Sequence, residues 1–197
     1  MPWLEPISLR GPHARLEPLA QDHCAGLTEA VKDGELWKLW YTSIPRADDM
    51  SKEIDRRLGL QAAGSMLPWT VFDADGRIAG MTTYMNVDTP NRRVEIGSTW
   101  YATRVQRSAL NTQCKLLLLD HAFEKLDCIA VEFRTHFFNH QSRRGIERLG
   151  AKLDGILRSH QIASNGTLRD TVVYSIIAAE WPTVKAHLTY QLNEKAR

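Results

Sequence analysis

The fold is decided by the stretch IGSTWYATRVQRSALNTQCK, residues 96–115. Its first part is rich in β-branched and aromatic residues, which predicts a strand that runs into a short polar loop. Apolar residues at three- and four-residue steps then predict a helix over 108–126. A helix N-terminus presents unpaired backbone N–H groups and the positive end of the helix dipole, which together bind phosphate oxygens. We therefore predict an anion site over residues 106–112.

The segments on either side of this stretch predict one mixed sheet with helices around it. Upstream, the patterns predict two short strands within 7–19, a helix over 21–33, a bent helical segment over 36–63 and strands over 68–73, 78–87 and 94–102. Downstream, they predict a strand over 128–134, a helix over 141–149, a hairpin of strands over 152–161 and 169–177, and a terminal helix over 180–194. This order predicts an α+β (mixed α/β) fold with a parallel crossover in its second half.

The composition is that of an ordinary globular protein. The chain has 197 residues, 43% of them hydrophobic and 24% charged, which predicts a single domain over 1–197. A net charge of +2 is too small to suggest nucleic-acid binding. No run of 18 apolar residues and no standard signal peptide occurs, so we expect neither membrane insertion nor secretion. The three separate cysteines indicate no disulfide framework, and we expect a cytoplasmic protein.

A series of motifs resembles one enzyme family. Gln106, Ala109 and Asn111 occupy the positions of a signature that reads Gln or Arg, two residues, Gly, one residue, then Gly or Ala. In this feature the chain resembles the GNAT superfamily of N-acetyltransferases. Four later motifs resemble its RimJ/RimL-type branch of ribosomal-protein alanine N-acetyltransferases: AFEKL at 122–126, NHQS at 139–142, GIERLG at 145–150 and RDTVVYS at 169–175. The resemblance extends over residues 7–181.

The resemblance implies a fold and a donor. The fold is the GNAT acyl-CoA N-acyltransferase fold, a bent and mostly antiparallel sheet that is splayed at its centre and flanked by helices. The donor is acetyl-CoA, which would lie in that opening. The cofactor-binding residues that the resemblance implies are Trp100, Tyr101 and Ala102 for pantetheine, Gln106, Arg107, Ser108, Ala109, Leu110, Asn111 and Thr112 for the pyrophosphate, and Asn139 and Ser142 on the opposite side. The last two residues also suit a plain helix cap.

The implied reaction is direct transfer of an acetyl group to a primary amine in a ternary complex. It requires a base for the ammonium, a donor for the oxyanion and an acid for the leaving thiolate. Tyr174 is the candidate acid, and Ser142 competes for that role by analogy with the same branch. Glu95 is the candidate base, with His136 and His160 as alternatives.

Each of these residues also has a purely structural interpretation. Tyr174 fits an ordinary strand residue whose hydroxyl is satisfied at the edge of the core. Glu95 fits one member of a charge pair with Arg92 or Arg93. Cys114 lies on the predicted helix and is expected to pack inside, which favours direct transfer over a covalent route.

An aromatic segment is the candidate substrate-binding region. Trp37, Trp40 and Tyr41 either pack in the core or form a wall of the acceptor site, which the resemblance places in this region. His136 and His140 lack a third ligand, so we predict no metal.

The acceptor is left open between a protein N-terminus and a small-molecule amine, and a homodimer is expected. An alternative of a different class is a catalytically silent CoA-binding regulatory or structural protein. That alternative arises because Ala109 and Asn111 replace glycines that let the backbone approach a pyrophosphate.

Overall fold

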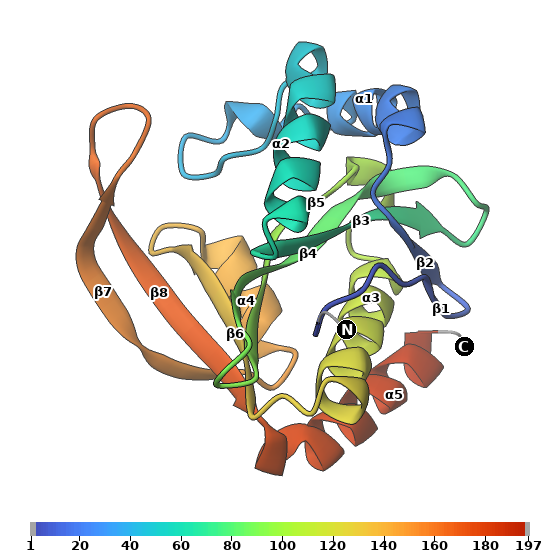
Figure 1. The fold of residues 1–197 in the computed structure, drawn as a ribbon, viewed down its shortest axis with the longest axis vertical. Helices are drawn as coiled ribbons and strands as arrows, with labels where there is room; N and C mark the ends of the chain where they lie inside the picture. The colour runs from blue at the N-terminus through green and yellow to red at the C-terminus, as the bar shows by residue number, and fades with distance from the viewer. Residues whose placement is uncertain (1–2, 196–197) are drawn as a thin grey trace.

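The computed structural model describes residues 3–195, which form one sheet of eight strands (Figure 1). The strand order is β1-β2-β3-β4-β5-β6-β8-β7. The strands are β1 (Leu9–Arg10), β2 (Ala14–Pro18), β3 (Met66–Asp73), β4 (Ile78–Asp88), β5 (Arg93–Tyr101), β6 (Ala130–His136), β7 (Lys152–Ile162) and β8 (Leu168–Ile177). All neighbours are antiparallel except β5 and β6, so the predicted parallel crossover and the predicted fold class are confirmed.

Helices cover both faces of this sheet. The α-helices are α1 (Cys24–Lys32), α2 (Met50–Ala62), α3 (Leu110–Asp120), α4 (His140–Glu147) and α5 (Trp181–Lys195). The shorter turns are η1 (Gln21–His23), η2 (Leu36–Lys38), η3 (Ala47–Asp49), η4 (Thr103–Val105), the π-helical η5 (His121–Lys125) and η6 (Ala178–Glu180). None of the helices within residues 3–195 has the length and apolar character needed to cross a bilayer.

Two hydrophobic cores fill the two faces. One core joins α1 and α2 to the sheet and contains Leu27, Ile54 and Trp100. The other lies under α3 and α5 and contains Cys114 and Trp181. Figure 1 shows the corresponding arrangement, with α1 and α2 at the top of the view and α3 and α5 at the bottom.

The sheet opens between its two central strands. β5 and β6 are paired only from Arg93–Ala130 to Glu95–Glu132. Beyond these three pairs, β5 stays with β4 as far as Tyr101, and β6 stays with β8 as far as His136. The strands therefore diverge, which confirms the splayed centre expected from the family resemblance.

A β-bulge lies in β5 beside this opening. The register with β4 passes from Met81–Trp100 to Thr83–Gly97, so β5 has one extra residue there, and Ser98 has a φ of 46°. Arg57 of α2 is almost fully buried, and it donates to the Ser98 carbonyl (3.2 Å) and to Thr83 Oγ1 (2.7 Å). Its Nε also donates to Glu53 (2.7 Å), so the buried charge is paired while it holds the bulge.

The central helix differs from its predicted extent. α3 ends at Asp120, and the residues up to Lys125 continue as a π-helix. The Tyr84 hydroxyl of β4 donates to the Leu118 carbonyl at this point. A side chain that bonds into the backbone ladder of a helix is a common cause of such a change.

Candidate active site

A cavity of about 550 Å³ lies at the opening between β5 and β6. Its walls come from β5, β6, the N-terminal ends of α3 and α4, the segment at 36–44 and the distal part of the β7–β8 hairpin. A second pocket of about 280 Å³ lies beside the loop that precedes α3. The larger cavity touches both faces of the sheet, because the two strands that would close it are not paired there.

Part of the predicted anion site at residues 106–112 lies on the α3 side of the cavity. Gln106, Arg107 and Asn111 line it. Arg107 alone in this loop adopts the left-handed region, with a φ of 60°, whereas Ala109 is in the right-handed helical region and Asn111 lies in the first turn of α3. The backbone at these two positions therefore does not need glycine for its conformation.

Two local hydrogen bonds hold the starts of α3 and α4 beside the cavity. Ser108 Oγ accepts from the Leu110 N–H (3.2 Å), and Asn139 Oδ1 accepts from the Ser142 N–H (3.0 Å). The second bond is a true N-cap on α4. Asn139 and Ser142 also line the cavity, so the capping role of Asn139 does not remove either residue from the candidate site.

The structure brings many of the predicted cofactor residues to one cavity. The larger cavity is lined by Trp100, Tyr101, Gln106, Arg107, Asn111, Asn139 and Ser142. The smaller pocket is lined instead by Ser108, Ala109 and Leu110. Ala102 and Thr112 are fully buried and line neither. Thr112 accepts from Arg148 (3.1 Å), so its side chain serves packing between α3 and α4.

Lys115 is a residue that the sequence analysis missed. It follows Asn111 by one helical turn, is only 6% exposed and also lines the cavity. Its ammonium donates to Thr99 Oγ1 (3.1 Å) and Thr82 Oγ1 (3.4 Å), and no carboxylate of the described residues forms an ion pair with it. Burial lowers the pKa of Lys115 to about 8. The position of this lysine on the helix, four residues after Asn111, was the available signal.

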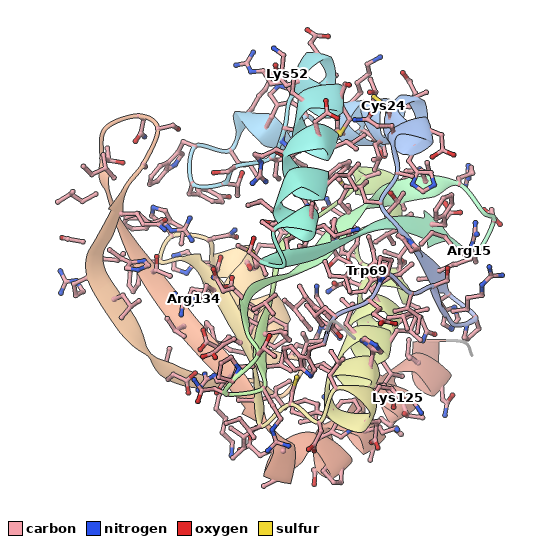
Figure 2. The ribbon with its side chains drawn as sticks, viewed as in Figure 1. Arg15, Cys24, Lys52, Trp69, Lys125 and Arg134 are labelled. Carbon is pink, nitrogen blue, oxygen red and sulfur yellow. The ribbon has the colours of Figure 1, made fainter. Side chains whose placement is uncertain are left out.

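Glu95 lies at the last position where β5 pairs with β6, and it lines the same cavity. It is 5% exposed, and its Oε2 accepts from Asn86 Nδ2 (2.6 Å). Arg134 lies 3.6 Å away and is labelled in Figure 2. Burial is the largest influence on Glu95 and raises its pKa above the ordinary value of 4.5. Glu95 is therefore not a solvent-exposed member of a charge pair with Arg92 or Arg93.

Tyr174 is placed differently from the other candidates. It is 1% exposed and belongs to the core under α3, on the opposite sheet face from Glu95. Its hydroxyl donates to Glu147 (2.7 Å) and accepts from Arg143 (3.2 Å), and it does not line the larger cavity. The geometry therefore supports the structural interpretation of Tyr174 and does not bring it to the site, so we make no catalytic proposal for it.

The predicted acceptor residues separate into two groups. Tyr41 lines the larger cavity, whereas Trp37 and Trp40 do not; Trp37 packs against the core under α1 and α2. Trp40 is half exposed and contacts the His136 ring edge-on, with 5.1 Å between ring centroids. His136 and His160 also line the cavity.

Neither cysteine chemistry nor a metal cluster is indicated by the geometry. Cys114 is fully buried, and burial raises the pKa of its thiol to about 12. This value leaves the thiol protonated at neutral pH. Within the part of the chain that the structure describes, no group of three or more His, Cys, Asp or Glu residues is arranged to hold a metal ion.

Comparison with known proteins defines the class of this fold and site. Residues 13–152 match the family model for the acetyltransferase (GNAT) domain, which covers more than half of the chain. The chain therefore belongs to the GNAT acetyltransferase family, as the sequence motifs indicated. This family uses acetyl-CoA as its acyl donor.

Individual relatives agree with this assignment. YdaF of Bacillus subtilis (strain 168), described as a candidate ribosomal N-acetyltransferase, is 34% identical over 107 residues, which are 54% of this chain and 57% of YdaF. The chain thus matches little more than half of that relative. A GCN5-related N-acetyltransferase from Brucella melitensis superposes with a TM-score of 0.86 and 29% identity, over 97% of this chain and 87% of that one.

A third relative shares the fold alone. It is the Salmonella typhimurium acetyltransferase that modifies the N-terminal serine of ribosomal protein L7/L12, with a TM-score of 0.75 and 19% identity over 87% of this chain and 99% of that one. The resemblance to ribosomal N-acetyltransferases that the motifs suggested is thus matched by YdaF in sequence and by the Salmonella enzyme in fold.

Proposed function

We propose that this protein transfers the acetyl group of acetyl-CoA directly to a primary amine bound at the same cavity. One observation carries the proposal. The cavity lies where β5 and β6 separate, with a helix N-terminus on one side and the buried carboxylate of Glu95 on the other. A donor and an acceptor can thus meet from opposite faces of the sheet.

The residues present fit the donor. The charged residues of the cavity lining are mainly cationic: Arg107, Lys115, Arg134 and Arg169 line it, and Glu95 is the one acidic residue of the lining within the described chain. An anion that enters such a cavity is attracted by the summed charge and by the first turn of α3. We assign the pyrophosphate to residues 106–112 and propose that Lys115 adds an ammonium one turn further in.

When bound, acetyl-CoA supplies a thioester whose carbonyl is open to nucleophilic attack. Glu95 is the proposed base, because a raised pKa brings a carboxylate closer to the pH at which proton transfer is efficient. The Asn86 amide fixes the carboxylate in place. The bulge at Ser98 leaves backbone groups of β5 out of the ladder, and we propose that an N–H there stabilises the oxyanion.

Ser142 is the proposed proton donor for the leaving thiolate. It lies in the first turn of α4 and lines the cavity from the donor side. Its backbone N–H is held by the Asn139 cap, which fixes the position of the residue while its hydroxyl is left to rotate. The role of Ser142 is thus compatible with its role in the helix.

A transfer assay tests the proposal. The purified protein is incubated with acetyl-CoA and a panel of small amines and N-terminal peptides, including ribosomal-protein N-termini suggested by the relatives, and the products are identified by mass spectrometry. Acetylated product with saturable dependence on both substrates supports the proposal. A saturable rise in unfolding temperature with acetyl-CoA but no transfer to any amine would instead favour a silent CoA-binding protein.

The expected homodimer stays a prediction. Light scattering of the purified protein measures its molar mass, which is 22.4 kDa for one chain.

A further inference from the structure

A second polar group lies on the same sheet face as Glu95. His136 of β6 is opposite Thr171 of β8, and Arg169 is two residues before Thr171. Directly opposed residues share a face, and so do residues two apart along a strand. Glu95 belongs to this face because it pairs in register with Glu132, four residues before His136. Phe133 and Tyr174 point to the other face, toward α3.

His136 presents a buried hydrogen-bond donor, its Nε2–H, at the cavity. It is 3% exposed and lines the cavity, and its Nδ1 accepts from the Phe138 N–H (3.1 Å). A neutral imidazole that accepts at Nδ1 bears its proton on Nε2. This Nε2 is buried and has no hydrogen-bond partner among residues 3–195. A buried donor without a partner is costly, which indicates that a ligand completes it.

The ring of His136 is held in this orientation. Trp40 contacts it at 5.1 Å and Tyr41 at 6.3 Å between ring centroids. Burial and then the charge of Arg169 lower the pKa of His136, so the ring stays neutral at physiological pH, while Asp170 acts in the opposite direction. The imidazole is thus a fixed neutral donor.

Arg169 offers a guanidinium that is half buried and has no ion-pair partner in the described part of the chain. Its Nε donates to Thr171 Oγ1 (3.1 Å), and the residue lines the cavity. Neighbouring arginines differ: Arg134 bonds Glu132 (2.9 Å), and Arg158 bonds Asp170 (2.7 Å). Burial lowers the pKa of Arg169 and the charge of Glu95 raises it, so the two groups influence each other across the cavity.

We propose that Arg169 and the Nε2–H of His136 bind a carboxylate of the acceptor, so that the enzyme acetylates primary amines that carry a carboxylate. A guanidinium presents a planar pair of N–H donors that match a carboxylate. Glu95 receives the ammonium end of the same molecule, and the two ends are therefore recognised by groups of opposite charge on one face. This inference rests on the proposed transfer reaction and names the class of its acceptor.

Matched acceptors test this inference by steady-state kinetics. 4-Aminobutanoate is compared with 4-aminobutanamide, and a peptide with N-terminal aspartate is compared with one with N-terminal asparagine. These pairs separate a free small acid from a protein terminus as the source of the carboxylate. In the wild type, kcat/KM is expected to be about tenfold or more higher for the acid of at least one pair, since bonds to charged groups have this worth.

Variants of Arg169 and His136 test which residues cause the preference for acids over amides. Arg169→Met is expected to abolish the preference by raising KM for the acid, with little change for the amide. His136→Phe keeps a ring against Trp40 and is expected to reduce the preference by a smaller factor. The matched control is Arg158→Met, because Arg158 is exposed, ion-paired and outside the cavity lining, and it should retain the preference.

Failure of the carboxylate inference can be told apart from failure of the proposed transfer activity. If no amine is acetylated by the wild type, the proposed function itself fails. If acids and amides are acetylated equally, if 2-aminoethyl phosphate is preferred to both acids, or if Arg169→Met lowers both members of a pair alike, the inference is overturned and the transfer activity stands. Should Arg169→Met fail to fold, loss of preference in His136→Phe decides the matter.

Discussion

The two sides of the cavity are built in different ways. On the α3 side, the lining groups come from two short segments, 106–115 and 139–142, each running into a helix. On the opposite side, the groups come from Glu95, His136 and Arg169, which are far apart in the sequence and meet through the pairing of β5, β6 and β8, and from Tyr41 in the segment at 36–44. A site made by one local segment is visible in a sequence, whereas a site made by strand register is not.

The two sides also differ in chemistry. The α3 side offers backbone donors and the Lys115 ammonium, which suits an anionic donor. The other side has the carboxylate of Glu95, which suits an amine. If this division is correct, substitutions on the α3 side should change the affinity for CoA. Substitutions on the side with Glu95 should change the rate of acetyl transfer.

The largest effect is expected for Glu95→Gln. Removal of the proposed base should lower kcat by a factor of about 100 to 10,000, the usual contribution of such a group. Affinity for CoA, measured by calorimetry, should stay unchanged. In the wild type, kcat/KM should fall as the pH drops through the raised pKa of Glu95, which lies above 4.5.

Glu132→Gln is the matched control for that variant. Glu132 pairs with Glu95 in register and shares its sheet face, yet it does not line the cavity. It should keep most of the transfer activity. Equal losses in the two variants would remove Glu95 from the mechanism.

A smaller effect is expected on the donor side from Asn111→Asp. The new negative charge in the first turn of α3 should repel a pyrophosphate and weaken CoA binding by roughly tenfold at low salt. The control is Asn165→Asp in the β7–β8 turn, which is exposed and should not change CoA affinity. Unchanged CoA affinity in Asn111→Asp would move the pyrophosphate away from this loop.

Lys115→Met is expected to weaken CoA binding and to stabilise the native protein. Folding lowers the pKa of this group from 10.5 to about 8, so an unfolded chain binds more protons than the native one between these values. The buried ammonium of Lys115 therefore destabilises the native protein fully below pH 8, and this destabilisation shrinks as the pH rises above 8. The variant should be more stable by up to about 3 kcal/mol below pH 8, and this gain should shrink toward pH 10.5.

Urea unfolding across this pH range measures the gain, and calorimetry measures the accompanying loss of CoA affinity. A pH-independent difference in stability would show that the lysine is not titrating as described.

The smallest effect on turnover is expected for Tyr174→Phe. Because the hydroxyl is bound by Glu147 and Arg143 in the core, its loss should cost about 1 kcal/mol of stability and leave kcat unchanged. A large fall in kcat at full stability would return Tyr174 to the mechanism.

Local patterns account for what could be predicted from the sequence. The strand, loop and helix at 96–115 follow from residue periodicity, and the order of elements led to the parallel crossover that the structure contains. Asn139 and Ser142 were identified through the resemblance of residues 139–142 to a family motif, and the helix cap at Asn139 was predictable because a helix start has a local signature.

The features that could not be predicted from the sequence depend on tertiary contacts. Arg57 belongs to a helix with an i,i+4 glutamate, a pattern typical of an exposed pair, yet it is buried against the bulge in β5. The orientation of Tyr174 depends on the register of β8 with β6, where it lies opposite Phe133. A change of one residue in that register would have reversed its face.

The most direct test of the two-sided account is a crystal structure of the protein with CoA. We expect the pyrophosphate at residues 106–112 and the pantetheine between β5 and β6, with its thiol end toward the face that contains Glu95. CoA bound elsewhere on the protein, with the space between β5 and β6 left free, would contradict this division into two sides.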